Sequence, residues 1–470
     1  MAERRYRIGG MLFIDIGSTY TKLAVADLED MRFIATASSP TTVWDVGEGF
    51  QKALGILQKQ DVPSCLMEKR YASSSAAGGL KMISIGLVPS LTVEAAKMAA
   101  LGAGAKVSCT FSFKMTRHQM DELIARQPDV VLLAGGTDGG DETTIIHNAR
   151  MLAESPLASP VVMAGNSKTS DDVAAIFETA GKYLRVTENV MPEMNKLNIE
   201  PVREVIREIF IERIIAAKGL DKINAYIDGI ALPTPLAVLE AVKTIRDVSG
   251  QDVVTIDIGG ATTDVHSVAY GLPTDSKVVL KGLPEPFAKR TVEGDLGVRH
   301  NISSIVEGTG SDVFTGLIAS CGYESDESRI HETLDRWSRQ TECIASGGFE
   351  KCLDSQLAFC AAKIAAGRHA GSLEQIWAPD GKLLIQYGKD LTGVRTLIGT
   401  GGPLINNEEP EKVLKGAMFE EENPFLLKPK QPRCYMDKKY ALFALGLFST
   451  VDRAAAKSLA ANYLKEMEVI

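Results

Sequence analysis

The sequence predicts a duplicated α/β fold whose two halves face each other across a cleft. The residues DIGSTYTK at Asp15–Lys22 return in altered form as DIGGATTD at Asp257–Asp264, 242 positions later. A continuous apolar run precedes each copy, and a second β-prone stretch follows it. Each half then continues into helical sequence, so the chain reads as two versions of one α/β unit.

Composition narrows the class of protein. At 470 residues the chain is too long for one ordinary core, so we expect two or three domains. It has 45% hydrophobic and 24% charged residues and a net charge of −9, and no basic stripe indicates a nucleic-acid groove. No apolar run reaches the roughly 18 residues of a membrane span. Scattered cysteines and a charged start without an export signal predict a cytoplasmic protein.

The first half is expected to open as a β-meander. Apolar alternation between turn signals predicts strands at Met11–Ile16, Tyr20–Asp27 and Met31–Ser38. A short amphipathic helix at Phe50–Lys59 and a strand at Lys69–Ser74 follow.

The middle of the chain has a different pattern of predicted helices and strands. An Ala-rich helix is predicted at Thr92–Gly102 with Thr92 as its N-cap. Short apolar strands at Asp129–Ala134 and Pro160–Ala164 then alternate with helices at Thr143–Glu154 and Ser170–Ala180. Such alternation predicts parallel strands whose two faces are covered.

The second half repeats the meander. We expect two helices before it, at Ile199–Lys218 and Pro233–Val248, and largely helical sequence at the end of the chain. Its strands and final helical stretch are predicted at Val253–Ile258, Thr262–Ala269, Lys277–Lys281, Leu383–Gln386, Leu397–Ile398 and Lys438–Glu466. The predicted lobes are residues 1–245, with an inserted α/β segment at about 73–200, and residues 246–470, whose last helices return to the first lobe.

The first repeated motif has the composition of a phosphate-binding turn. Gly17 lets the backbone turn tightly, and Ser18 and Thr19 add hydroxyl groups beside their amides. Lys22 begins the outgoing strand, where its ammonium group would neutralise a phosphoryl oxygen. An ordinary hairpin turn also favours Gly, Ser and Thr, so Asp15 and its turn indicate phosphate binding only together with the second copy.

Together with the second copy, this pattern predicts a phosphate-binding site. Two carboxylates at the ends of apolar strands are costly unless they are solvated, paired or bound to a metal. Asp15 and Asp257 would repel each other until Mg²⁺ lies between them. The binding residues expected in this turn are Gly259, Gly260, Thr262 and Thr263.

A third glycine cluster, Gly399-Thr400-Gly401-Gly402, follows a short strand in the second half and suits the adenosine side of a nucleotide. The denser cluster at Ala134–Asp141 lacks G-x-G-x-x-G, so we leave it open between a ligand contact and a structural connection. Asp264, Asp295 and Glu293 are the candidate carboxylates for positioning water or an acceptor hydroxyl.

The three motifs together resemble those of the actin-like ATPase superfamily, which has a duplicated ribonuclease H-like fold. Longer stretches resemble the glutamate mutase accessory protein family, called GlmL or MutL, which is unrelated to mismatch repair. These stretches are RYASSSAAGGLKMISIGLVPSLTVEAAKMAALGAGAKV, PDVVLLAGGTDGGDETTIIHNARML, DIGGATTDVHSV and RTVEGDLGVRHN. The resemblance implies an ATPase with ATP and Mg²⁺ as ligands that reactivates an adenosylcobalamin-dependent mutase, and it leaves the oligomeric state open.

Three alternatives remain at this point. A small-molecule kinase of the sugar-kinase type would use Asp295 as its base. A binding or filament-forming module would use the nucleotide as a structural clip. An activator of radical dehydratases would need a pair of cysteines to bridge an iron–sulfur cluster, and no suitably placed pair stands in the sequence.

Overall fold

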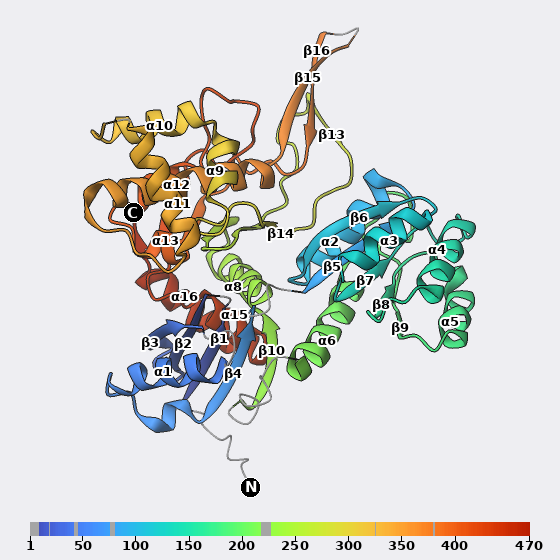
Figure 1. Ribbon diagram of the computed structural model, residues 1–470, viewed down its shortest axis with the longest axis horizontal. Helices are drawn as coiled ribbons and strands as arrows, with labels where there is room; N and C mark the ends of the chain where they lie inside the picture. Colours follow the sequence, from blue (N-terminus) through green and yellow to red (C-terminus); the bar gives the residue numbers. More distant parts are fainter. Residues whose placement is uncertain are drawn as a thin grey trace.

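The computed structural model describes residues 9–17, 19–41, 46–75, 80–217, 227–324, 326–378 and 381–470. The described residues form four sheets (Figure 1). None of the described helices combines the length and the apolar character that crossing a membrane requires.

The first sheet contains the predicted meander. Its strand order is β10-β4-β1-β2-β3, with β1–β3 antiparallel and both β4 and β10 parallel to β1. The strands are β1 (Gly10–Ile16), β2 (Tyr20–Asp27), β3 (Arg32–Pro40), β4 (Lys69–Ser74) and β10 (Gly229–Pro233). The first helix, α1 (Val46–Gln58), packs its apolar side chains Phe50, Ala53 and Leu57 into the core beside this sheet.

The second sheet repeats this topology. Its order is β14-β12-β11-β17-β18-β19, with β11, β12 and β14 antiparallel and β17 and β18 parallel to β11. The strands are β11 (Val253–Ile258), β12 (Thr263–Val268), β14 (Ala288–Glu293), β17 (Thr396–Thr400), β18 (Arg433–Met436) and β19 (Glu468–Val469). Because the two sheets share the order and direction of five strands, the predicted duplication of an α/β unit is confirmed.

The prediction was wrong about the third strand of this meander. The stretch Lys277–Lys281, expected there, contains β13 (Val278–Lys281). This strand pairs with β16 (Gly381–Tyr387), which also pairs with β15 (Ser372–Ala378). These three strands form a small sheet that projects from the molecule (Figure 1). The third meander strand is β14, whose alternating polar sequence AKRTVE follows a proline-rich loop.

The third sheet is parallel, as predicted, and has the order β6-β5-β7-β8-β9. Its strands are β5 (Lys81–Gly86), β6 (Lys106–Ser112), β7 (Val130–Leu133), β8 (Val161–Met163) and β9 (Leu184–Val186). The helices around it are α2 (Glu94–Gly102), α3 (Arg117–Ala125), α4 (Thr143–Glu154), α5 (Ser170–Thr179) and α6 (Glu200–Ala217). We call this sheet with α2–α6 the middle unit; it lies to one side of the first and second sheets (Figure 1).

The expected N-cap Thr92 is wrong. A π-helical turn at Pro89–Val93 precedes α2, and Thr92 Oγ1 instead accepts hydrogen bonds from the backbone N–H groups of Leu87 and Val88, at 2.8 and 3.0 Å. The hydroxyl therefore stabilises the turn that enters α2 rather than the helix itself.

The helices of the second half complete the core. They are α8 (Thr234–Ser249), α9 (Ile302–Thr309), α10 (Ser311–Ser320), α11 (Glu327–Arg339), α12 (Gly347–His369), α13 (Gly402–Ile405), α14 (Pro410–Lys415), α15 (Leu442–Val451) and α16 (Arg453–Glu466). Phe448 of α15 lies 5.9 Å from the ring of Phe13, and Tyr463 of α16 lies 5.0 Å from that of Phe33. The last helices thus pack against the first sheet, while the predicted lobe boundaries stay a prediction.

Candidate functional site

The two acidic hairpins line one cleft of about 2040 Å³. The predicted residues that line it are Asp15, Gly17, Thr19, Lys22, Asp257, Gly259, Gly260, Thr262, Asp264 and Gly402. Asp15, Lys22 and Asp257 also enclose a gap of about 10 Å³ together with Thr234 and Tyr440. The two bends therefore lie at one site, which is the condition for a shared phosphate grip.

Both hairpins use the same backbone turn. Gly17 N donates to Tyr20 O at 3.0 Å, and Gly259 N donates to Thr262 O at 2.9 Å. A Cβ on Gly17 would lie only 2.5 Å from Tyr20 O, so this tight turn requires glycine. Ser18, predicted as a binding residue, lies outside the described residues.

Asp15 is fully buried at the end of β1. Its Oδ2 accepts from Lys22 Nζ at 3.3 Å, and its Oδ1 accepts from Ser73 Oγ at 3.0 Å and from the Thr234 hydroxyl. The ammonium group of Lys22 also lies 3.6 Å from the ring centroid of Tyr440. Burial opposes the charge of Lys22, but Tyr440, Asp15 and Asp257 together raise its pKa above the ordinary value. The cleft thus holds a permanent cation beside the first turn.

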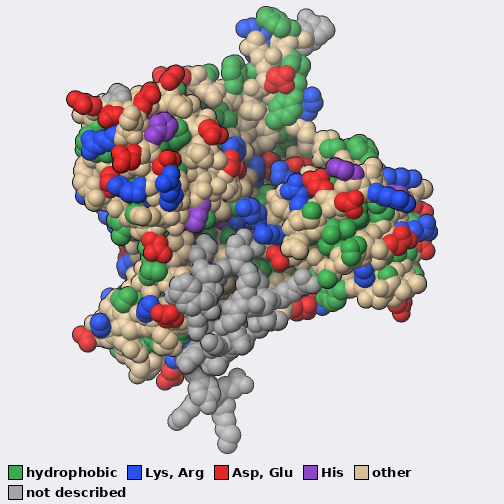
Figure 2. Space-filling model, in the orientation of Figure 1, with side chains coloured by type: hydrophobic (Ala, Val, Ile, Leu, Met, Phe, Trp, Pro, Cys, Tyr) green, Lys and Arg blue, Asp and Glu red, His purple; other side chains and the backbone are tan. Residues whose placement is uncertain are grey.

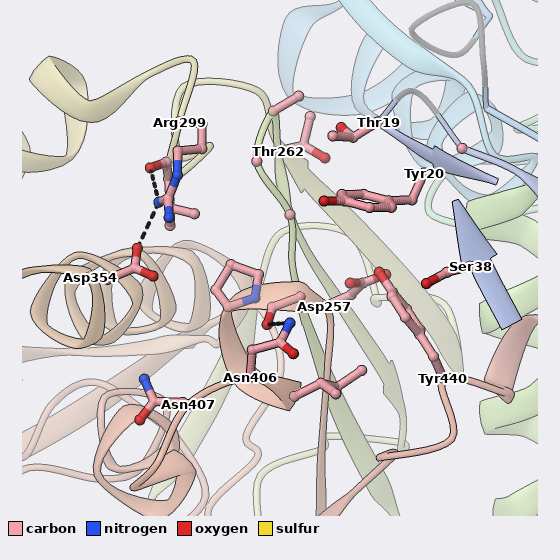
Figure 3. A pocket seen from close by; sticks show the side chains of 18 of the residues that line it. Thr19, Tyr20, Ser38, Asp257, Thr262, Arg299, Asp354, Asn406, Asn407 and Tyr440 are labelled. Atoms are coloured by element: carbon pink, nitrogen blue, oxygen red, sulfur yellow. Dashed lines mark hydrogen bonds and ion pairs between the residues drawn. The ribbon is translucent and has the colours of Figure 1, made fainter. Parts of the chain in front are cut away.

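At Asp257, near the end of β11, the surroundings disfavour the charged form of the side chain. Burial raises the pKa of its carboxyl group to about 7; Lys22 counteracts this, and Asp264, Asp15 and Asp437 raise it further. Figure 3 shows Asp257 beside Tyr440 at the centre of the cleft. A second cation at this point would relieve the repulsion among the carboxylates.

This set of groups fits Mg²⁺. The ion takes oxygen ligands and is usually held by one or two carboxylates together with substrate phosphates and water. Asp15 and Asp257 offer such oxygens. Among the described residues no cluster of three or more His, Cys, Asp or Glu side chains is arranged to hold a metal, so phosphate and water would complete the coordination.

The third motif contacts the second hairpin. Gly401 has a φ of +99°, and a Cβ there would lie 2.1 Å from Ile258 O and 2.8 Å from Asp257 Oδ1. Gly402 lines the cleft and begins α13. Gly399 and Thr400 are buried instead, and Thr400 Oγ1 donates to Asp437 at 3.0 Å.

Polar side chains line the cleft on both sides of α13. Arg299 donates to Asp354 at 2.6 Å across from Asn406, whose amide donates to Gly402 O at 2.9 Å (Figure 3). Asn407 lies nearby and also lines the cleft. These residues surround the space next to the third motif.

The five predicted acidic residues do not all lie together in the cleft. Asp264 lines the cleft and binds Arg290, whose Nε and Nη2 lie 3.0 and 2.7 Å from its Oδ1. Asp295 is instead held by both terminal nitrogens of Arg368, at 2.8 and 2.9 Å, and Glu293 shares the same arginine at 2.7 Å. Alternate β14 residues such as Arg290 face the cleft, so Glu293 faces the opposite side.

Other predicted residues have structural contacts. Thr263 is buried and donates to Leu296 O at 2.7 Å. The Gly-rich loop at 134–141 is held internally: Gly139 N donates to Asn166 Oδ1 at 2.9 Å, and Asn189 donates to Asp138 Oδ1 at 2.9 Å. These bonds favour the structural connection over a ligand contact for this loop.

Sequence reasoning missed Thr234 and Tyr440. Thr234 begins α8, and Tyr440 lies in the loop between β18 and α15 with a φ of +52°, in the strained region for a non-glycine residue. Burial raises the pKa of the Tyr440 hydroxyl to about 12. Neither residue belongs to a recognisable spacing, because each reaches the site from a distant part of the chain.

Comparison with known proteins gives two close matches. A family model described as "MutL protein" matches residues 11–464. A curated relative, Protein MutL from Clostridium tetanomorphum, is 44% identical over 453 residues, which cover 93% of this chain and 95% of that protein.

Solved structures give distant matches. Gluconate kinase from Lactobacillus acidophilus has a TM-score of 0.35 and 10% identity, over 98% of this chain and 92% of that one. The activator of the 2-hydroxyisocaproyl-CoA dehydratase from Clostridium difficile with bound ADPNP has a TM-score of 0.31 and 10% identity, over 98% of this chain and 99% of that one. The fold is defined by the sheet topology described above.

Proposed function

The chain belongs to the MutL protein family, and on this premise we propose that it binds and hydrolyses ATP to reactivate an adenosylcobalamin-dependent mutase. Glutamate mutase or a related aminomutase is the proposed partner. The observation that carries the proposal is that Asp15, Lys22 and Asp257 line one cleft, next to the two glycine turns.

The residues proposed to hold ATP fall into two groups. The backbone N–H groups of the turns, with Thr19, Thr262 and Lys22, would bind the phosphates. The adenosine would lie beside Gly402 and α13, where Arg299 and Asn406 line the cleft.

Asp15 and Asp257 would hold Mg²⁺ beside the phosphates. When bound, Mg²⁺ would neutralise charge on the phosphates and on Asp257. Lys22 stays protonated beside Asp15 and would add a fixed positive charge on the first hairpin. Asp264, fixed by Arg290, is the proposed group for positioning the attacking water.

The nucleotide cycle would then change the separation of the two hairpins. A triphosphate reaches both turns, whereas loss of the terminal phosphate shortens the ligand and weakens the bridge. Such a cycle can do work on a partner only if the partner binds the two states with different affinity. The middle unit, which contributes Gly104 and Lys106 to the cleft wall, is the proposed site of partner contact.

The decisive experiment is reactivation. An inactivated adenosylcobalamin mutase is incubated with this protein, ATP and fresh cofactor, and its activity is followed with time. Recovery that requires all three components supports the proposal. Recovery that is the same without ATP, or none with glutamate mutase and related aminomutases, contradicts it.

A small-molecule kinase is the weaker alternative, because Asp295, its proposed base, is held by two bonds to Arg368. ATP consumption that increases with a sugar or an organic acid, and is unchanged by a mutase, would favour the kinase.

A further inference from the structure

One cation of the nucleotide cleft belongs to the middle unit. Lys106 is the first residue of β6, is partly buried and lines the cleft. Its Nζ lies 2.7 Å from the position that a Cβ on Gly294 would occupy. The lysine therefore crosses from the middle unit to the end of β14.

Gly294 places this ammonium group beside the second phosphate turn. The side-chain amide of Asn301 donates to Gly294 O at 3.0 Å and to Ala261 O at 3.1 Å, so one nitrogen atom contacts both carbonyl groups. Ala261 is the turn residue between Gly260 and Thr262. Lys106 thus approaches the turn that is proposed to hold the phosphates.

Arg290 fixes the backbone that carries Lys106. The guanidinium group is almost fully buried, binds Asp264 through two nitrogens, and donates from Nη1 to Leu101 O and Ala105 O, both at 3.3 Å. The end of α2 and the residue before Lys106 are therefore tied to the strand that leaves the second turn. Figure 2 shows Lys and Arg side chains gathered where the middle unit meets the rest of the molecule.

Lys106 differs from the other Lys and Arg side chains of the cleft in having no carboxylate partner among the described residues. Asp295, whose pKa it influences, is already bound by both terminal nitrogens of Arg368. The paired cations of the cleft are Lys22, Arg290, Arg299, Lys351, Lys412, Lys438 and Lys439, each with a salt bridge to Asp or Glu. A partly buried ammonium group that lines the cleft near a phosphate turn and forms no salt bridge of its own is suited to bind an anion.

We propose that Lys106 binds the terminal phosphate of the bound nucleoside triphosphate. The inference rests on the proposed function and deepens it: the phosphate would join the second turn to the middle unit. Its loss on hydrolysis would release Lys106 and free the start of β6, while the Arg290 contacts to α2 remain. The middle unit would thereby respond to the presence of the third phosphate rather than to the nucleoside.

The test compares two nucleotides on four proteins. Binding of a non-hydrolysable ATP analogue and of ADP, both with Mg²⁺, is measured by calorimetry for wild type, Lys106→Met, Lys106→Arg and Lys81→Met. Lys81 is the matched control, because it faces Lys106 in the β5–β6 ladder but is exposed. We expect Lys106→Met to weaken the ATP analogue about tenfold and to change ADP affinity less than twofold. Lys106→Arg retains most of the discrimination, and Lys81→Met retains all of it.

A second readout follows the middle unit itself. Amide hydrogen exchange at 101–112 should slow when the wild type binds the ATP analogue, and this protection should disappear in Lys106→Met. Equal losses for ATP and ADP, or no loss for either, overturn the role of Lys106 while ATP binding by the wild type preserves the proposed function. A wild type that binds neither nucleotide overturns both.

Discussion

The two hairpins have the same backbone turn but differ in charge at one equivalent position. In the first hairpin Lys22 stands directly opposite Asp15 in the strand pair and forms a salt bridge with it. In the second hairpin Asp264 stands at the same place opposite Asp257, so two carboxylates face each other. Asp264 obtains its counter-charge from Arg290 on the next strand, at 2.7 Å.

Because of this difference, we expect the two hairpins to have different roles in the site. The first hairpin neutralises its own aspartate and presents a fixed cation. The second leaves Asp257 with a pKa raised to about 7, chiefly by burial and, more weakly, by neighbouring carboxylates, although Lys22 opposes the shift. An aspartate in these surroundings gains most from an added cation, so we expect the metal to depend on Asp257 more than on Asp15.

The largest expected effect comes from removing Asp257. Asp257→Ala should reduce ATP hydrolysis at least about 100-fold, because a principal group for holding metal and phosphate is lost. Phosphate release is measured at saturating Mg-ATP, and the fold is checked by the thermal midpoint. The exposed Asp312→Ala is the control. Near-normal hydrolysis by Asp257→Ala would refute the assignment.

The pair between Asp264 and Arg290 should matter most for stability. Arg290→Met removes the counter-charge of Asp264, which retains only the hydrogen bond from the Thr262 hydroxyl, and one donor each from the carbonyl groups of Leu101 and Ala105. Breaking such a buried pair costs about 3–5 kcal/mol. Urea unfolding measures the change. The double variant Asp264→Asn/Arg290→Met should recover part of it, and additive losses would show that the pair is not coupled.

Breaking the first pair should cost less. In Lys22→Met, Asp15 keeps the hydroxyl donors Ser73 and Thr234, so we expect a loss of about 1–3 kcal/mol by urea unfolding. ATP affinity should nevertheless fall about tenfold, because the fixed cation is gone. An affinity equal to wild type would mean that Lys22 serves only to balance Asp15.

The smallest effect concerns a lysine outside the cleft. Burial, with a smaller contribution from Lys289, lowers the pKa of Lys389 from 10.5 to about 7. Between these pH values the unfolded chain binds a proton that the folded chain does not, so the contribution of Lys389 to stability increases as pH rises.

The difference in unfolding free energy between wild type and Lys389→Met tests this. It should move in favour of wild type by about 1–2 kcal/mol between pH 7.5 and pH 9, with a limiting slope of about 1.4 kcal/mol per unit. The exposed Lys382→Met is the control. A difference for Lys389→Met that does not change with pH would contradict the lowered pKa.

Local pattern was sufficient for much of the fold. The strand Val253–Ile258 has the predicted bounds, because an apolar run between polar turns fixes both ends. The strand at Val278–Lys281 was found too, but its partner β16 lies about a hundred residues later, and no local signal assigns it to the projecting sheet. Strand pairing of this kind depends on tertiary contacts that sequence periodicity does not contain.

Local sequence pattern likewise identified some residues of the site and missed others. The repeated motif identified the two hairpins and both aspartates, since a duplication is visible in one sequence. Tyr440 and Thr234 were missed because each arrives from another element and lies in no motif. Asp295 lies two residues beyond the end of β14 and is absent from the residues that line the cleft, and its partner Arg368 comes from α12, far along the chain. Its role as a base therefore stays a prediction.

A structure of the protein with Mg²⁺ and a non-hydrolysable ATP analogue tests the central claim most directly. The account predicts one phosphate chain in contact with both glycine turns, and a metal bound between Asp15 and Asp257. Phosphates held by a single hairpin, or a nucleotide bound elsewhere on the molecule, would contradict it.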